Sequence, residues 1–293
     1  MRNKDVVIAE EQVDMEELMG EAEGSRFRAL AARLNYLAMD RSDMQFAAKE
    51  CCRRMAKPRL GDWTLLKRAG RYLRGRPRCI QAFPFEDYKK CLKGFGDSDW
   101  AGEKPGRKST SGGAVMLGGS MLKSWSTSQS VIALSSGEAE LYALMRLATQ
   151  TLGIMSMARD FGENLTAEIQ TDSSAAMGMA HRAGLGGKSR HIDVQFLWIQ
   201  DCIKSKEVKL AKVHTDDNLA DVLTKYLGKE SFEKHLKAMG YTWREGRASE
   251  GRNVACQGRS EPEDTRARRG ISICNVYSNY ENIVNKHSEG KPV

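Results

Sequence analysis

The sequence contains no apolar run close to the roughly 20 residues that a membrane-spanning helix needs. Residues 1–25 are rich in glutamate, unlike the basic and apolar residues of signal and transit peptides. We therefore expect a soluble intracellular protein, cytoplasmic or nuclear, with no membrane partner. With 293 residues, 41% of them hydrophobic, the chain can bury one sizeable core and a smaller second one.

Cysteine pairs of the kind that bind zinc are also absent. The seven cysteines include no Cys-x-x-Cys pair, and two of them, Cys51 and Cys52, are adjacent. An adjacent pair of cysteines does not easily link distant segments by disulfides, and an odd number of cysteines cannot all form disulfides within the chain. We expect reduced thiols and no zinc site.

Acidic residues are scarce in residues 53–78, which hold ten Lys or Arg and a single acid, Asp62. The formal net charge of +8 is therefore distributed unevenly, since residues 1–25 are acidic. A basic stripe of this kind favours a polyanion as partner. A solvated helix face is the alternative that charge alone leaves open.

Apolar residues recur at helical spacing in three segments, 27–37, 43–55 and 63–73. Prolines and glycines separate or end these segments, at Pro58, Gly61, Gly75 and Pro77. The pattern predicts a small helical unit over residues 26–90, whose aromatic and methionine side chains pack its core. Residues 1–25 are expected to be a flexible acidic terminus.

The pattern changes after residue 90, where short segments between glycine-rich or charged turns predict antiparallel strands at 91–97, 112–117 and 122–126. The elements predicted next are helices at 139–161, 173–181 and 192–203, strands at 167–171 and 207–213, and a final helix from Leu219. Strands followed by alternating helices and strands give an α/β domain with a mixed sheet, over residues 91–240. Residues 241–293 are rich in Arg, Glu, Gly and Ser and are expected to be disordered.

Four acids occur at positions from which a carboxylate would point off the end of the predicted sheet or toward one of its faces. Asp97 ends a strand, Asp172 lies at a strand–helix junction, and Asp221 lies one turn into the last helix. Glu140 shares a helix face with Leu144 and so points toward the sheet, where a carboxylate needs a cation or a partner. Because clustered carboxylates hold Mg²⁺, the sequence predicts that these acids bind divalent metal.

Other acids near them have simpler structural explanations. Glu138 fits a capping box at a helix N-terminus. Asp99 lies past the predicted strand end and shapes a turn, and Asp217 caps the last helix. Taken alone, Asp172 is also explained as an N-cap, so its place in the metal site depends on the other acids.

Six segments occur in a fixed order: Gly96–Gly102 (GDSDWAG), Arg107–Gly112 (RKSTSG), Ala133–Glu140 (ALSSGEAE), Thr171–Ala175 (TDSSA), Ser189–Asp193 (SRHID) and Leu219–Lys225 (LADVLTK). In this order and content, about residues 92–240 resemble the ribonuclease H domain of copia-type LTR retrotransposon Pol polyproteins. The helical unit before them is similar to the stretch that joins the reverse transcriptase to the ribonuclease H. The polymerase motif Tyr-x-Asp-Asp is absent from the sequence, so we expect no DNA synthesis.

The resemblance implies a ribonuclease H-like fold with a mixed five-stranded sheet, and hydrolysis of the RNA strand of an RNA/DNA hybrid. It assigns Asp97, Glu140, Asp172 and Asp221 to the four metal-binding positions, the same acids as above. The implied cofactors are two Mg²⁺ ions, with Mn²⁺ as the alternative, and a reverse transcriptase polymerase domain is a further candidate partner. A catalytically inactive relic that still binds nucleic acid is the alternative function, and use of the fold for protein contacts is a third.

Two polar clusters are candidate contacts to the phosphates of the hybrid: Arg107, Lys108 and Ser109, and Lys188, Arg190 and His191. Recognition would depend on backbone shape and 2′-hydroxyls rather than on base identity. The alternative for the second cluster is a solvated helix start. His214, seven residues before Asp221, is a candidate proton shuttle, with an ordinary surface histidine as the alternative.

Overall fold

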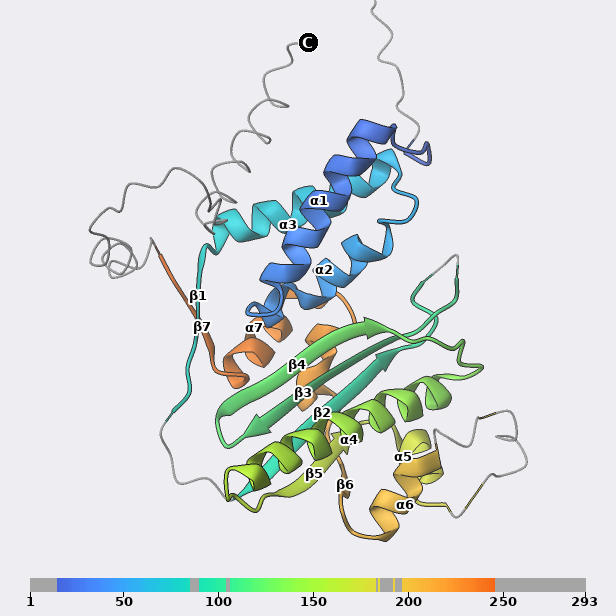
Figure 1. Cartoon of the computed structure of the whole chain (residues 1–293), viewed down its shortest axis with the longest axis vertical. Coiled ribbons are helices and arrows are strands. Elements are labelled where there is room, and N and C mark those ends of the chain that lie inside the picture. The colour runs from blue at the N-terminus through green and yellow to red at the C-terminus, as the bar shows by residue number, and fades with distance from the viewer. Residues whose placement is uncertain are drawn as a thin grey trace, which may run out of the picture.

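A computed structural model describes residues 15–84, 90–103, 106–182, 184, 192 and 197–245. A unit of three helices lies beside a five-stranded sheet (Figure 1). The unit consists of α1 (Glu21–Leu37), α2 (Ser42–Arg53) and α3 (Trp63–Gly75), with a short 3₁₀ turn, η1 (Leu60–Asp62), before α3. All three predicted helices are present, and α1 begins inside the segment that was expected to be flexible.

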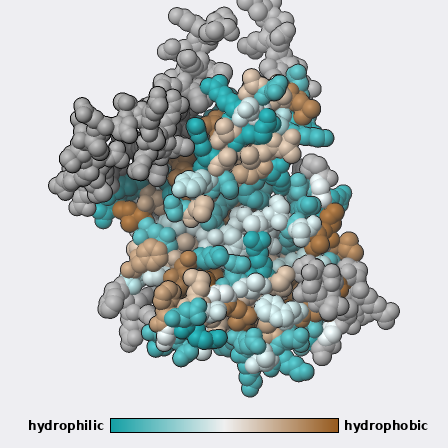
Figure 2. Space-filling model, in the orientation of Figure 1, coloured by the Kyte–Doolittle hydropathy of each residue, from teal (hydrophilic) through white to brown (hydrophobic). Residues whose placement is uncertain are grey.

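The core of the helical unit contains the apolar residues that the helical spacing selected, among them Phe27, Leu30, Leu34, Met44 and Leu66. The aromatic side chains of its basic stripe also pack inward. The ring of Trp63 contacts that of Phe27 edge-on, with 5.7 Å between the ring centroids. The stripe's cations on α3 are exposed, and they are Lys67, Arg68, Arg71 and Arg74. Figure 2 shows many hydrophilic residues on the visible face of this unit.

The sheet has the strand order β4-β3-β2-β5-β6. Its bounds are β2 (Cys91–Asp99), β3 (Thr110–Leu117), β4 (Ser120–Ser128), β5 (Thr166–Thr171) and β6 (Lys209–Lys212). The strands β2, β3 and β4 are antiparallel neighbours, whereas β5 runs parallel to β2 and β6 parallel to β5. The predicted fold class is confirmed, because this is a mixed five-stranded, ribonuclease H-like sheet flanked by helices and preceded by a helical unit.

Helix α4 (Ser136–Asp160) crosses one face of the sheet, with α5 (Ser174–Ala180) and α6 (Trp198–Lys204) beyond it (Figure 1). Two glycines of β2 allow a close approach, because a Cβ on Gly94 would lie 2.9 Å from Leu147 Cδ1 and one on Gly96 3.2 Å from Leu147 Cδ2. The backbone of β2 therefore packs directly against α4. This contact brings the first turns of α4 to the end of β2.

The opposite face is covered by a 3₁₀ turn, η5 (Leu219–Leu223), and by α7 (Lys229–Ala238). The predicted helix from Leu219 is present as a 3₁₀ helix of five residues, all of them buried against the sheet. A Cβ on Gly112 of β3 would lie 2.6 Å from Thr224 Cγ2, so this glycine admits the turn. The prediction missed α7, which starts one residue after Gly228.

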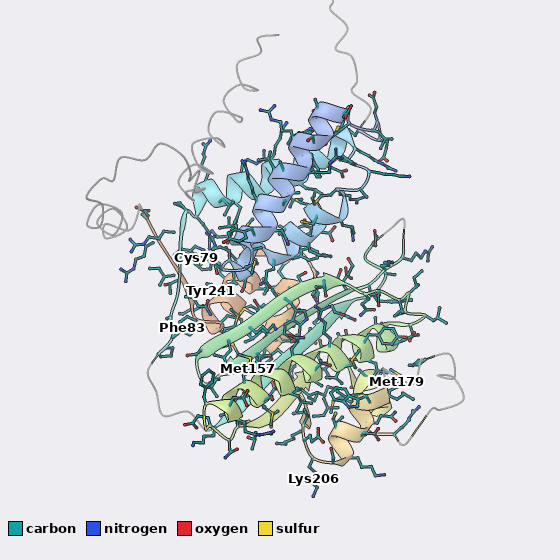
Figure 3. All side chains as sticks on the ribbon, in the orientation of Figure 1. Cys79, Phe83, Met157, Met179, Lys206 and Tyr241 are labelled. Atoms are coloured by element: carbon teal, nitrogen blue, oxygen red, sulfur yellow. The ribbon has the colours of Figure 1, made fainter. Side chains whose placement is uncertain are left out.

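Buried polar contacts join the helical unit to the sheet. Ser42 Oγ of α2 lies 2.5 Å from Ser124 Oγ of β4 and accepts a hydrogen bond from Tyr241 OH at 2.9 Å. Tyr241 begins β7 (Tyr241–Arg244), which pairs antiparallel with β1 (Arg78–Gln81) (Figure 3). This strand lies past residue 240, where the sequence predicts the domain to end.

The five cysteines in the described part of the chain are free thiols, as predicted. They are Cys51, Cys52, Cys79, Cys91 and Cys202. In the same residues, no helix combines the length and the apolar character that crossing a membrane would require.

Candidate metal centre

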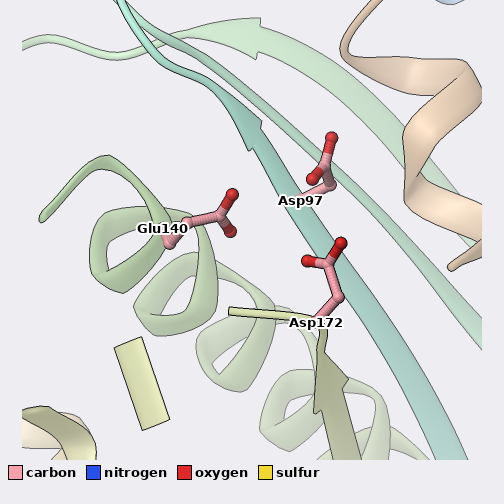
Figure 4. Close-up of side chains that lie close together, drawn as sticks. All are labelled: Asp97, Glu140 and Asp172. Atoms are coloured by element: carbon pink, nitrogen blue, oxygen red, sulfur yellow. The ribbon is translucent and has the colours of Figure 1, made fainter. Parts of the chain in front are cut away.

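Asp97, Glu140 and Asp172 converge at one end of the sheet from three different elements (Figure 4). Asp97 lies near the end of β2, Glu140 in the first turns of α4, and Asp172 directly after β5. Because β2 and β5 are parallel, their carboxyl ends meet at the same edge. Each residue offers a carboxylate oxygen, and these oxygens lie within 4.8 Å of one another. The structure thus brings together three of the predicted ligands.

Asp221, the fourth predicted acid, adjoins this group through Asp97. Both contact Lys225, whose Nζ lies 3.0 Å from Asp221 Oδ2 and 3.9 Å from Asp97 Oδ2. Asp221 is only 5% exposed, because η5 holds it against the sheet. We call Asp97, Glu140, Asp172 and Asp221 the acid cluster.

Neighbouring side chains cap the helices α4 and α5, so the acids of the cluster do not serve as helix caps. Ser173 Oγ caps α5 by accepting an N–H bond at 3.2 Å, so the explanation of Asp172 as an N-cap does not hold. Ser135 Oγ caps α4, and Glu138 accepts a hydrogen bond from Leu134 N–H at 2.9 Å. Glu138 thus has a structural role at the start of α4, but the capping box is incomplete, because its carboxylate binds the N–H of Leu134 and not that of Ser135.

The structure changes the explanations of two other acids. Asn218 caps η5, whereas Asp217 pairs with Lys234 at 2.8 Å, so the prediction of Asp217 as the cap is wrong. Asp99 is the last residue of β2, in register with Thr110, rather than past the strand. It is not one of the three acids that converge within 4.8 Å.

Burial and the charges of neighbouring acids raise the pKa values of Asp97, Glu140 and Asp221. Burial and the charge of Asp221 raise the pKa of Asp97 to about 6. Burial and the charges of Asp97 and Asp172 raise the pKa of Glu140 to about 9. Burial also raises the pKa of Asp221. Without a cation, these carboxyl groups therefore keep their protons to higher pH than usual, whereas a bound cation would favour their charged forms.

Unpaired oxygens show that the cluster fits a metal ion. Glu140 Oε2 and Asp221 Oδ1 are buried and have no hydrogen-bond partner among the described residues. A buried carboxylate oxygen without a partner is unfavourable. All donor atoms of the cluster are carboxylate oxygens, which suit hard divalent cations such as Mg²⁺ or Mn²⁺.

Hydrogen bonds hold three of the carboxylates in place. Thr224 Oγ1 donates to Asp97 Oδ2, Ser98 N–H donates to Glu140 Oε1 at 3.3 Å, and Thr215 Oγ1 donates to Asp172 Oδ2 at 2.8 Å. None of these three donors was predicted from the sequence as a site residue. For Thr224 the available signal was its position three residues after Asp221 in the last motif.

The predicted phosphate contacts fall into two groups. Arg107 and Lys108 are exposed in the connection between β2 and β3, at the end of β2 that carries Asp97. Ser109 has no exposed surface, and its Oγ accepts a hydrogen bond from Ala101 N–H at 3.1 Å, so it shapes this connection. Lys188, Arg190 and His191 lie outside the described residues. Phosphate binding at these positions stays a prediction.

His214 lies between the end of β6 and the turn that contacts Asp172. Its side chain is 74% exposed, and its Nδ1 accepts a hydrogen bond from Asp216 N–H at 3.3 Å in the short turn η4 (Thr215–Asp217). The next residue, Thr215, is the one that contacts Asp172. The proton-shuttle role of His214 stays a prediction.

No model of a known protein family matches the chain. Several curated proteins that it is similar to are transposon polyproteins. "Retrovirus-related Pol polyprotein from transposon RE1" of Arabidopsis thaliana is 29% identical over 220 residues, which are 74% of this chain and 15% of the relative. "Retrovirus-related Pol polyprotein from transposon TNT 1-94" of Nicotiana tabacum is 28% identical over 213 residues, 72% of this chain and 16% of the relative. The chain thus spans about 15% of the length of these relatives.

Among solved structures, LC11 ribonuclease H1 in complex with an RNA/DNA hybrid is 16% identical, with a TM-score of 0.34. The match covers 50% of this chain and 99% of that chain.

Proposed function

We propose that the chain, which is similar to retrovirus-related Pol polyproteins of transposons, is a metal-dependent ribonuclease H. The reaction is hydrolysis of the RNA strand of an RNA/DNA hybrid. The observation that supports it is the convergence of Asp97, Glu140 and Asp172 within 4.8 Å, from elements far apart in the sequence. Asp221 adds a buried fourth carboxylate, and two oxygens of the cluster, Glu140 Oε2 and Asp221 Oδ1, have no hydrogen-bond partner among the described residues.

The acid cluster would hold two divalent ions, Mg²⁺ or Mn²⁺. When bound, such ions neutralise charge on the attacking and leaving oxygens of a phosphodiester and lower the pKa of bound water. The chain itself supplies the ligands and their orientation. Thr224, Ser98 and Thr215 donate the hydrogen bonds that aim the carboxylates.

The substrate is recognised by its backbone in this proposal. The exposed cations Arg107 and Lys108 lie on the connection that follows Asp97 and would contact phosphates. The formal net charge of +8 favours the same partner. A reverse transcriptase polymerase domain, the second proposed partner, would add affinity for the hybrid.

The test is cleavage of a hybrid whose RNA and DNA strands carry different labels, with purified protein and Mg²⁺. We expect only the RNA strand to be cut, and Asp172→Asn to bind the hybrid without cutting it. Asp160→Asn, which changes an exposed acid at the far end of α4, is the matched control and should cut normally.

Two other results would contradict the proposal. Hybrid binding without cleavage by the unaltered protein would indicate the inactive nucleic-acid-binding relic. Absence of both binding and cleavage would indicate that the fold serves protein contacts.

A further inference from the structure

A cavity of about 470 Å³ lies between the helical unit and the segment that follows Asp221. Its walls come from α2, from α3 and from residues 222–233, and Figure 1 shows α7 next to α2. Lys225 lines the cavity and also contacts the acid cluster. The cavity is therefore a neighbour of the candidate metal centre.

The acids on the cavity wall are already neutralised. Asp43 accepts two hydrogen bonds from the guanidinium of Arg41, at 2.7 and 2.9 Å. Glu233 forms an ion pair with the guanidinium of Arg76. Neither carboxylate is left to repel an anion that enters the cavity.

The cations on the wall are not neutralised to the same extent. Arg68 and Lys229 are exposed, and neither has an ion-pair partner among the described residues. Arg68 belongs to the basic stripe that the sequence analysis singled out on α3. The cavity thus presents two free positive charges beside Lys225, which suits a phosphate group.

The cavity wall formed by residues 222–233 also carries an exposed aromatic ring, that of Tyr226. Tyr226 is 58% exposed, and the guanidinium carbon of Arg68 lies 5.2 Å from the centroid of its ring. The ring of Phe46 contacts the Tyr226 ring edge-on, with 4.8 Å between the two ring centroids. Exposed aromatic rings next to cations bind unpaired nucleobases by stacking. The wall therefore offers partners for both parts of a nucleotide.

The size of the cavity decides which form of nucleic acid it accepts. A volume of this order holds a small ligand and excludes a double helix. Only a nucleotide that has left the base stack can enter, and unpaired bases are the ones that proteins stack on aromatic side chains.

We propose that this cavity binds one unpaired nucleotide in a single-stranded extension of the substrate. Its phosphate contacts Arg68 and Lys229, and its base stacks against Tyr226. The proposal rests on the proposed nuclease function and adds a binding site outside the acid cluster. It also gives the basic stripe on α3 a ligand.

The test uses RNA/DNA hybrids with a single-stranded extension that carries 2-aminopurine at successive positions. They are bound to the Asp172→Asn protein in Mg²⁺, so that cleavage does not interfere. We expect fluorescence quenching at one position of the extension and its loss in Tyr226→Ala. Tyr36→Ala, which removes a 70% exposed tyrosine on α1, is the control and should keep the quenching.

Affinity supplies the second measurement. Arg68→Ala should weaken binding of the extended hybrid by about 3- to 10-fold and leave binding of a blunt hybrid unchanged. Arg71→Ala removes an exposed arginine of the same helix that does not line the cavity, and should affect both hybrids equally and less.

The inference is overturned if no position is quenched, if quenching survives Tyr226→Ala, or if both arginine variants behave alike. These results leave the nuclease proposal intact, because cleavage of a blunt hybrid by the unaltered protein tests that proposal separately.

Discussion

Lys225 Nζ lies 3.0 Å from Oδ2 of Asp221, the residue four positions earlier in the sequence. Burial alone would lower the pKa of Lys225, but the charges of Asp97 and Asp221 outweigh burial and raise it. The ammonium group therefore stays protonated and neutralises part of the acid cluster. A divalent ion bound by the same two carboxylates has to compete with it.

Replacing Lys225 with methionine should increase the affinity for Mg²⁺. Removal of one positive charge beside Asp97 and Asp221 strengthens cation binding by about 3- to 10-fold in a partly screened site. Isothermal titration of the metal-free protein with Mg²⁺ measures the effect.

The matched control is Lys234→Met, which breaks an ion pair of 2.8 Å with Asp217 outside the acid cluster. Its Mg²⁺ affinity should equal that of the unaltered protein. Unchanged or weaker binding by Lys225→Met would show that the lysine supports the site instead of competing for it.

The metal-free protein should become less stable as the pH rises. The pKa of Glu140 is about 9 instead of its ordinary 4.5, and that of Asp97 about 6 instead of 3.8. In the pH range between the ordinary and the raised pKa of each group, the folded state binds more protons than the unfolded state. The free energy of unfolding therefore decreases with increasing pH in this range. Thermal melts in a chelator should give a lower Tm at about pH 8 than at about pH 5.

Mg²⁺ should raise the Tm more at the higher of these two pH values, because it replaces the protons that the carboxylates have lost. Glu140→Gln should flatten the pH dependence in the chelator. A Tm of the metal-free protein that increases over the same range contradicts the raised pKa values.

Removing the hydroxyl of Thr224 should impair metal binding through Asp97. Thr224→Val deletes the hydrogen bond that favours the charged carboxylate, so the pKa of Asp97 rises further. The loss of this buried bond destabilises the fold by about 1 kcal/mol. Titrations with Mg²⁺ at several pH values should show the midpoint of binding shifted to higher pH. Thr224→Ser keeps the donor and should not shift it, and equal shifts in both variants would refute this role.

Adding one methyl group at Gly112 should disturb the fold and the site together. The Cβ of Gly112→Ala would lie 2.6 Å from Thr224 Cγ2 and 2.8 Å from Leu223 Cβ, so η5 must move away from the sheet. We expect a loss of about 1–3 kcal/mol in urea unfolding, together with weaker Mg²⁺ binding. Gly153→Ala, in open space on α4, should instead stabilise by about 0.5–1 kcal/mol. Similar stabilities for the two variants would show that Gly112 tolerates a side chain.

Local periodicity predicted the elements whose apolar residues face one side. The three helices of the helical unit, the antiparallel strands β2 to β4 and the long α4 all occur where their patterns place them. At Leu219–Leu223 the pattern predicted a helix but not its 3₁₀ geometry, because every residue is buried and no polar face marks the type of helix. It also missed the pairing of β1 with β7, because two four-residue strands far apart in the sequence carry no local signal.

The four carboxylates can be identified from sequence alone, because Asp97, Glu140, Asp172 and Asp221 each follow from a motif and its position along the chain. How they act together depends on the packing of elements that are far apart in the sequence. Parallel pairing of β2 and β5 brings two of the acids to one edge, and glycines at the packing contacts let α4 and η5 bring the other two. The same packing leaves carboxylate oxygens unpaired, places Lys225 among them and forms the neighbouring cavity. These are distances between segments far apart in the chain, which local patterns cannot specify.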